Sequence, residues 1–174
     1  KAVLGLRAKE IHICMSPAAE QAICHLIELC GDDYEAERYE RKTDLVCEEH
    51  PFVFPDDVQK GDALIAFSKK SVLDVAGRLE EAGINASVIY GSLPPEIRRR
   101  QMHLFHKGKT KVVVATDAIG MGLNLPVRRI VFLQAEKFDG ISRRPLKTQE
   151  VKQIAGRAGR FGIYDTGYVT AMGE

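Results

Sequence analysis

The chain has 174 residues, of which 45% are hydrophobic, and a formal net charge of +1; this suits one α/β domain with a core and is too short for two ordinary domains. Its four cysteines form no CxxC pair and have no histidine at zinc spacing, which argues against a metal ribbon or a disulfide framework and favours buried, reduced thiols in an intracellular protein. No apolar run approaches the roughly 20 residues that span a bilayer, so we expect no membrane segment.

The first 60 residues divide into an ordered start and an irregular acidic stretch. Residues 10–17 are expected to form a short strand, and residues 16–30 then begin with Ser-Pro and carry the apolar stripe of a helix. Residues 32–60 are acidic and contain two prolines, which indicates a linker or domain edge, with its one plausible strand at 34–42. Because the chain does not begin with Met, we expect a piece of a longer polypeptide, in which residues 1–31 are the end of a preceding domain or the first strand and helix of this one.

A regular alternation of strands and helices begins near Gly61. Strands are predicted at residues 62–67, 86–90, 111–116, 128–133 and 166–172, and helices at residues 71–83, 95–108 and 148–159. Helices of about a dozen residues between strands form crossover connections, so the sheet should be mainly parallel with helices on both faces. One α/β domain is therefore expected at residues 61–174. In such sheets, ligands bind at the carboxyl ends of the strands.

A glycine-rich turn follows the predicted strand at 111–116. Thr116 and Asp117 end this strand, and Gly120 and Gly122 would let the backbone approach a ligand. The backbone N–H groups and the hydroxyl of such a turn suit phosphate oxygens. The segment is only a weak match to a dinucleotide-binding fingerprint because the third glycine is absent, and a turn without any ligand could use the same glycines.

The last predicted helix, which Thr148 can cap, carries Gln153, Arg157 and Arg160 at spacings of four and three. Residues at this spacing share one helix face, so the three side chains should point into one crevice. Their alanine and glycine neighbours would let the helix pack closely, and two adjacent guanidinium groups favour an anion between them. A phosphate chain is the natural anion. A solvated basic face is the alternative, and it would not require so many small residues.

Two further loops follow predicted strands. Ser68 follows the strand at 62–67, whereas Gly91 and Ser92 follow the strand at 86–90 and precede a helix that presents three consecutive arginines. Hydroxyls, helix N-termini and basic side chains suit a phosphate backbone. Helix capping by the two serines and an exposed arginine run that aids solubility explain the same residues.

Charge is distributed unevenly along the chain. Residues 1–93 carry 10 basic and 17 acidic side chains, whereas residues 94–174 carry 15 and 7. The basic half could bind nucleic acid or nucleotide phosphates, although two solvated faces of opposite charge would have the same composition. His103 and His106 stand three residues apart, but no cysteine or carboxylate completes a set of ligands, so no metal site is expected.

With these residues in place, the sequence resembles the C-terminal motor half of superfamily 2 helicases. FSKKS at 67–71 resembles motif IV, VVVATDAIGMGLNLP at 112–126 resembles motif V, and QIAGRAGR at 153–160 resembles motif VI. Together with SVIYGSLPP at 87–95, the motif V segment is most similar to the RNA helicases of the mitochondrial degradosome and their bacterial relatives, close to the superkiller-type group. The resemblance covers nearly the whole chain. It implies a RecA-like fold and an ATP-dependent motor that acts on single-stranded RNA.

The resemblance also implies a role for each site residue. Arg157 and Arg160 would reach the β- and γ-phosphates of ATP, with Arg160 as an arginine finger, and Gln153 would position the γ-phosphate or the attacking water. The residues implied to lie on the nucleotide side are Asp117, Gly122 and Asn124. The residues implied to hold the RNA backbone are Ser68, Gly91, Ser92 and Thr116.

No GxxxxGK[ST] loop and no acidic Walker B box are present in the sequence. The lysine, the magnesium ligands and the catalytic carboxylate that ATP requires would therefore come from a first RecA-like domain of the same polypeptide, and this chain alone should be inactive. CMS at 14–16 replaces the CGE that is usual in eukaryotic members, which favours a bacterial source and a cytoplasmic location over a mitochondrial matrix. An exoribonuclease partner is also implied, and no membrane partner.

Three other functions remain to be weighed against this one. A nicotinamide-dependent oxidoreductase lacks support because the third glycine and the acidic ribose partner are missing. A non-catalytic RNA-binding module would not explain paired arginines among small residues. A DNA helicase is the closest competitor, because contacts to the phosphate backbone do not distinguish DNA from RNA without the 2′-hydroxyl.

Overall fold

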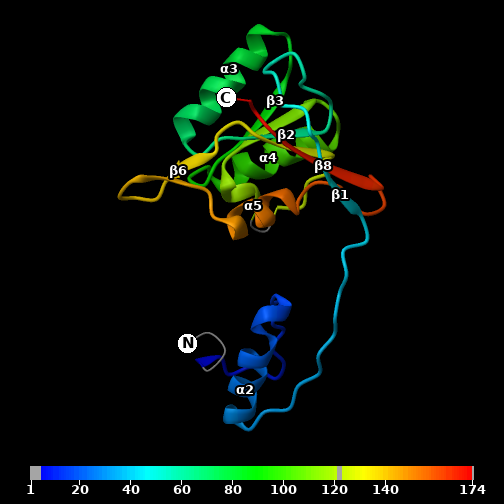
Figure 1. Ribbon diagram of the computed structural model, residues 1–174, viewed down its shortest axis with the longest axis vertical. Helices are drawn as coiled ribbons and strands as arrows, with labels where there is room; N and C mark the ends of the chain where they lie inside the picture. Colours follow the sequence, from blue (N-terminus) through cyan, green and yellow to red (C-terminus); the bar gives the residue numbers. More distant parts are fainter. Residues whose placement is uncertain (1–4, 121–122, 174) are drawn as a thin grey trace. The chain divides into compact units, whose positions relative to one another are not determined.

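The computed structural model describes residues 5–120 and 123–173 (Figure 1). The chain forms two compact units, Lys1–Glu40 and Arg41–Glu174, each of which is considered by itself. Within the described ranges, no helix combines the length and the apolar character needed to cross a bilayer.

The described part of the first unit includes a turn of 3-10 helix, η1 (Pro17–Ala19), followed by the α-helix α2 (Glu20–Cys30). The helix ends as predicted at Gly31, whose φ of 74° is readily adopted by glycine. The strand predicted at residues 10–17 is wrong: these residues have no strand assignment, because the described part of this unit offers no second strand to complete a ladder. Residues 32–40 have no regular structure.

The second unit contains a six-stranded sheet in which every pairing is parallel. Its strands are β1 (Asp44–Cys47), β2 (Asp62–Ile65), β3 (Ala86–Ile89), β4 (Val112–Ala115), β5 (Arg129–Phe132) and β8 (Thr166–Ala171), in the order β1-β8-β5-β2-β4-β3. A separate antiparallel hairpin consists of β6 (Glu136–Phe138) and β7 (Arg143–Pro145). The predicted α/β class with a parallel sheet is confirmed.

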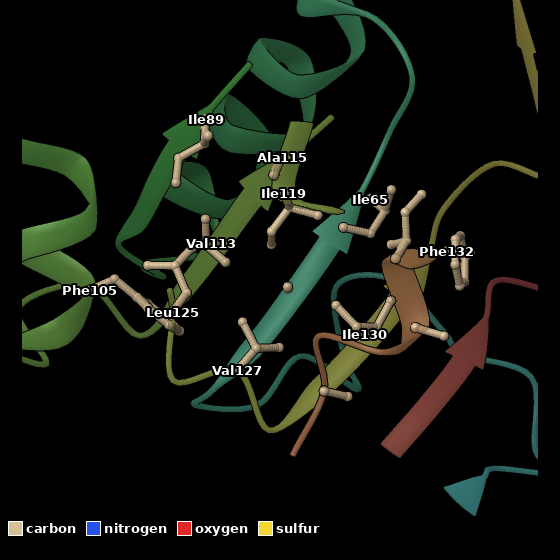
Figure 2. Packing of buried hydrophobic residues seen from close by; sticks show 14 residues of the cluster. Ile65, Ile89, Phe105, Val113, Ala115, Ile119, Leu125, Val127, Ile130 and Phe132 are labelled. Carbon is tan, nitrogen blue, oxygen red and sulfur yellow. The ribbon is translucent and has the colours of Figure 1, made fainter. Parts of the chain in front are cut away.

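Helices cover both faces of this sheet. α3 (Lys69–Glu81) packs on one face, and α4 (Pro95–His106), the 3-10 turn η2 (Asp117–Gly120) and α5 (Thr148–Ala155) pack on the other. Successive residues of a strand point to opposite faces. Ile65 therefore belongs to the core under α4, η2 and α5 (Figure 2), whereas Leu64 belongs to the core under α3. Both residues are fully buried. Burial on both faces explains why the central strands read as unbroken apolar runs.

The second unit begins earlier than the sequence indicates. The predicted boundary lies near Gly61, but β1 already pairs with β8, from Asp44 opposite Thr166 to Cys47 opposite Val169. Phe52, only 3% exposed, lies in the core under α3. The acidic stretch therefore contributes an edge strand and a core residue, which its composition conceals because the strand has only four residues, all of them exposed.

The cysteines differ from the prediction in their burial. Cys14, Cys30 and Cys47 are exposed and Cys24 is partly buried, and all four are free thiols. The prediction of buried thiols is wrong because these residues lie in the first unit and in the edge strand β1, away from the two apolar cores.

A buried ion pair joins the amino ends of two central strands. Arg129 of β5 is the register partner of Asp62 of β2, and its guanidinium donates two hydrogen bonds to that carboxylate, from Nε to Oδ1 at 3.0 Å and from Nη2 to Oδ2 at 2.7 Å. Nη1 reaches Glu48 at 3.1 Å, and Nη2 also donates to the carbonyl of Asp57 at 2.7 Å. Burial raises the pKa of Asp62, and the hydrogen bond from Arg129 opposes this shift.

Replacing Asp62 by alanine should destabilise the second unit by about 3–5 kcal/mol, because the buried guanidinium of Arg129 would lose its bidentate partner. Glu48→Gln is the matched control, since Glu48 contacts the same guanidinium but is 31% exposed in its side chain, against 1% for Asp62. The control should cost about 1 kcal/mol or less. Urea unfolding of both variants measures the difference, and equal losses would contradict the asymmetry.

Candidate functional site

Three predicted nucleic-acid loops lie next to one another at the carboxyl edge of the sheet. β2, β4 and β3 are neighbours in this order, and they run parallel. Ser68 therefore follows β2, Thr116 follows β4, and Gly91 with Ser92 follows β3 along one continuous edge. The role of these residues in binding stays a prediction.

The hydroxyls of Ser68 and Thr116 at this edge already accept local hydrogen bonds. Ser68 caps α3, since its Oγ accepts a hydrogen bond from the backbone N–H of Ser71 at 2.9 Å. Thr116 is only 7% exposed, and its Oγ1 accepts from the N–H of Ala118 at 3.3 Å. A ligand at this edge would therefore meet hydroxyls that already have partners.

The loop after β3 differs in one respect from the prediction. Ser92 does not cap the next helix: α4 begins at Pro95, its N-cap is Pro94, and no side chain caps it. Proline is suited to this start because it has no N–H to satisfy. Instead, Arg98 holds the loop, because its Nη2 donates to the carbonyl of Gly91 at 2.8 Å and to that of Leu93 at 3.3 Å.

Gln134, which is not among the predicted site residues, connects the end of β5 to the loop after β2. Its Oε1 accepts a hydrogen bond from the N–H of Phe67 at 2.9 Å, and its Nε2 lies 3.5 Å from Oγ of Ser71. Gln134 follows β5, so it ties the loop after β2 to the neighbouring strand. The rule that polar residues after buried strands mark a site would have found it.

The arginine-bearing segment meets the glycine-rich turn on one face of the sheet. Gly120 of η2 packs against α5 so closely that a Cβ there would lie 3.5 Å from Cγ of Gln153 and 3.6 Å from Cγ1 of Ile154. Nε and Nη2 of Arg157 both donate to the carbonyl of Gly120, the former at 3.2 Å. Gln153 and Arg157 therefore both contact Gly120 of η2.

The prediction that Gln153, Arg157 and Arg160 share one helix face is wrong. α5 ends at Ala155, with Gly156 as its C-cap, and Arg157 and Arg160 lie in the turns that follow. The small residues that suggest close helix packing lie instead in the turns after the helix, where Gly159 has a φ of 69° that glycine readily adopts. Arg160 is partly buried, and among the described residues its side chain makes no hydrogen bond or ion pair. Thr148 is the first residue of α5, and the N-cap is Lys147.

Two residues from the segment read as a linker hold the turn at residues 156–159. Arg41 donates from Nη1 to the carbonyl of Gly156 at 2.9 Å and from Nη2 to the carbonyl of Ala158. Thr43 donates from Oγ1 to the carbonyl of Gly159 at 2.8 Å. Carbonyls after a helix C-terminus have no intrahelical donors, so these contacts supply them. The bonded residues are more than 110 positions apart in the sequence, so local sequence patterns do not predict these contacts.

The predicted nucleotide-side residues are less closely grouped. Asp117 is partly buried in η2 and pairs with Nζ of Lys137 at 3.0 Å. Asn124 is exposed, and its backbone carbonyl contacts Nε2 of His106 at 2.8 Å; in the described part of the chain its side chain has no partner on η2 or α5. Gly122 lies outside the described residues.

The β6–β7 hairpin adds a cluster of charges that the sequence analysis does not identify. Lys137 and Arg144 both bind Glu150 of α5, with Nζ at 2.7 Å from Oε1 and Nη1 at 2.9 Å from Oε2. These two hydrogen bonds, that from Arg144 first, lower the pKa of Glu150. The hairpin turns at Asp139 and Gly140, whose φ is 104°, and an Asp-Gly pair is a hairpin signal that could have revealed it.

Comparison with known proteins shows which family the segment that carries this site belongs to. The model of the helicase conserved C-terminal domain matches residues 41–162, which include η2, α5 and all three loops at the carboxyl edge. The chain belongs to the helicase C-terminal domain family. A model of the DEXQ-box helicase domain of Suv3 matches residues 1–39, almost the same range as the first unit of this helicase chain.

Curated relatives of this helicase domain are similar along nearly its whole length. "ATP-dependent RNA helicase SUV3, mitochondrial" from Oryza sativa subsp. japonica is 43% identical over 99% of the chain, which spans 30% of that relative. The SUV3 helicase of Saccharomyces cerevisiae is 41% identical over 98% of the chain, which spans 24% of it. The C-terminal domain of the DEAD-box protein Dbp5 has a TM-score of 0.52 at 19% identity, with 77% of each chain covered, and supports the RecA-like fold alone.

These relatives bear on the expected location. The SUV3 proteins of rice, of yeast and of Candida albicans, like human SUPV3L1, are all named as mitochondrial. These names give no support to the bacterial, cytoplasmic expectation. The departure from CGE at residues 14–16 is therefore not a sufficient guide to the source.

Gly159→Ala should destabilise the second unit of this helicase chain by about 2–4 kcal/mol. A Cβ at Gly159 would lie 2.6 Å from the backbone nitrogen of Gly167, and the left-handed backbone adds its own strain of about 1–2 kcal/mol. Gly162→Ala is the matched control, because Gly162 has a φ of 80° but nothing within 4 Å. Thermal unfolding should show the control losing only about 1–2 kcal/mol. Similar losses in both would argue against the close backbone contact.

The stability contributed by Glu150 should depend on pH. Because its pKa is lowered in the folded state from an ordinary value of 4.5, the contribution is fully present above that value and declines as pH falls below it. The difference in unfolding free energy between the unsubstituted chain and Glu150→Gln should therefore shrink between pH 6 and pH 3. Denaturant titrations at a series of pH values measure this, and a difference that stayed constant across the range would refute it.

Proposed function

We propose that this chain is the second motor domain of an ATP-dependent RNA helicase. The observation that carries the proposal is the contact of Gln153 and Arg157 with η2, which unites the motif V and motif VI segments of a helicase-family domain at one place. The relatives named as ATP-dependent RNA helicases are about three to four times longer than the chain, since it spans 30% and 24% of two of them. The chain is therefore proposed to supply part of an activity, not the whole.

On the nucleotide side, the donors of the 153–160 segment suit a phosphate chain. Arg160 is the proposed arginine finger, because its guanidinium has no acceptor among the described residues, and a free planar donor pairs well with phosphate oxygens. Arg157 already binds the carbonyl of Gly120 through two nitrogens, which leaves Nη1 to contact a phosphate. Gln153 is exposed beside it and would orient the γ-phosphate or water.

The remaining half of the nucleotide site is proposed to lie on a first motor domain of the same polypeptide. The match of residues 1–39 to a DEXQ-box domain model supports this arrangement, because those residues resemble part of such a domain. Magnesium would be held there and would neutralise charge on the phosphates when bound. The residues of this chain would then act by donating hydrogen bonds to charge that develops in the transition state.

On the RNA side, the proposed contacts are the loops after β2, β4 and β3. Gly91 and Ser92 are exposed at this edge, and Ser68 and Thr116 follow the adjacent strands. Such contacts to phosphates are indifferent to base sequence, which suits a motor that moves along a strand. The names of the relatives favour RNA over DNA as the substrate and a mitochondrial location. The exoribonuclease partner is proposed from the family resemblance alone.

Arg160→Ala, in a polypeptide that joins this chain to its first motor domain, should reduce RNA-stimulated ATP hydrolysis by about 10³- to 10⁵-fold. The fold and the affinity for RNA should change little, because an arginine finger acts on the transition state. Arg78→Ala is the matched control, since Arg78 is an exposed arginine of α3 on the opposite face of the sheet.

The measurement is steady-state ATPase with single-stranded RNA and with DNA in parallel. A near-normal kcat in Arg160→Ala would mean that the motif VI turn does not act on the nucleotide, and it would overturn the proposal. If DNA stimulated ATP hydrolysis as strongly as RNA, the proposed substrate would be either nucleic acid and not RNA in particular.

A further inference from the structure

Lys137 joins two elements of the candidate site by its ammonium group. Its Nζ lies 3.0 Å from Oδ2 of Asp117 in η2 and 2.7 Å from Oε1 of Glu150 in α5. The side chain is 18% exposed, so water and salt weaken these ion pairs less than those of a fully exposed lysine. Both carboxylates raise the pKa of Lys137, with Glu150 contributing most, so the ammonium stays charged.

Arg144 is the natural comparison for Lys137. The two are register partners across the β6–β7 hairpin, and both bind the carboxylate of Glu150, which lies between two cations that would otherwise repel each other. Arg144 makes its other ion pair with Asp139 in the hairpin itself, at 3.3 Å, whereas Lys137 makes its other ion pair with Asp117. Among the described residues, only Lys137 of the two reaches η2.

In the described part of the chain, two contacts link η2 to α5 and the turn after it, in addition to the apolar core that Ile119 shares with Ile154, and the contact through Lys137 is the second of the two. The first lies at the end of η2, where Gly120 packs on Gln153 and Ile154 and accepts hydrogen bonds from Arg157. The second joins Asp117, at the start of η2, to Glu150, in the first turn of α5. A single attachment would let one element pivot on the other. Two attachments at separate points make them move together.

We propose that Lys137 is a positioning residue that couples movement of η2, which directly follows the proposed RNA contact Thr116, to the arginine-bearing turn after α5, at the nucleotide side. The inference rests on the proposed function. Without Lys137, η2 would keep its packing on α5 through Gly120 and Ile119 but would lose the link between Asp117 and Glu150, so movement driven by the RNA strand would be transmitted incompletely to Arg157 and Arg160. Misplacement of a catalytic group by about 1 Å costs up to about 100-fold in rate, which sets the scale of the effect.

The test compares Lys137→Met with Arg144→Met in the polypeptide that carries both motor domains. Lys137→Met should lower the RNA-stimulated kcat about 10- to 100-fold, with little change in KM for ATP or in RNA affinity. Arg144→Met removes the other cation on Glu150 and should lose a comparable amount of thermal stability, yet keep a nearly normal stimulated kcat. Lys137→Arg, which keeps the charge, should recover most of the rate.

Hydrogen exchange provides a readout that does not depend on turnover. In the 174-residue chain, Lys137→Met should speed amide exchange at residues 117–120 more than Arg144→Met does. Equal exchange in the two variants, or equal loss of stimulated kcat, would overturn the coupling role while leaving the proposed function standing. Absence of RNA stimulation in the unsubstituted protein would overturn the proposed function, and this inference with it.

Discussion

The close backbone contact between Gly159 and Gly167 sets the geometry of the candidate site. A Cβ at Gly167 would lie 2.5 Å from the carbonyl carbon of Ala158, so the turn after α5 rests directly on β8 without a side chain between them. Gly159 also donates its N–H to the carbonyl of Val127, just before β5, at 2.9 Å. With the turn held at this height above the sheet, Ala158 is fully buried and Arg157 reaches the carbonyl of Gly120. A larger side chain at either glycine would move the turn, and Arg157 with it, away from η2.

The two ends of the parallel sheet carry different kinds of polar residues. At the amino ends of β2 and β5, Asp62 and Arg129 are almost fully buried and satisfy each other, which stabilises strand pairing and leaves no charge free for a ligand. At the carboxyl ends, the polar groups lie in loops, where Gly91 and Ser92 are exposed to solvent. Stability and the proposed chemistry are therefore separated along the strand direction, which allows loops at one end to change conformation while the other end stays paired.

The sequence predicts well those features that depend on short-range patterns. The central strands are apolar runs bounded by turns, so the parallel sheet and the strand-end position of Thr116 follow from local composition. Prediction fails where a contact spans the chain: Arg41 and Thr43 lie in a stretch that reads as linker, and they bind carbonyls more than 110 residues away. It also fails at the end of α5, because alanine and glycine next to arginine are compatible with a packed helix and with a turn alike, and the approach of β8 decides between them. The β6–β7 hairpin lies between these cases, since its Asp-Gly turn is a local signal.

The clamp formed by Arg41 has a mechanical consequence. Arg41 is the first residue of the second unit, directly after the unstructured residues 32–40, and its guanidinium grips the carbonyls of Gly156 and Ala158. Tension or reorientation in the connecting chain would therefore reach the arginine-bearing turn directly through the side chains of Arg41 and Thr43, besides its path through β1 and β8. Where the chain enters the second unit, it therefore also binds the turn that carries the residues proposed to face the nucleotide.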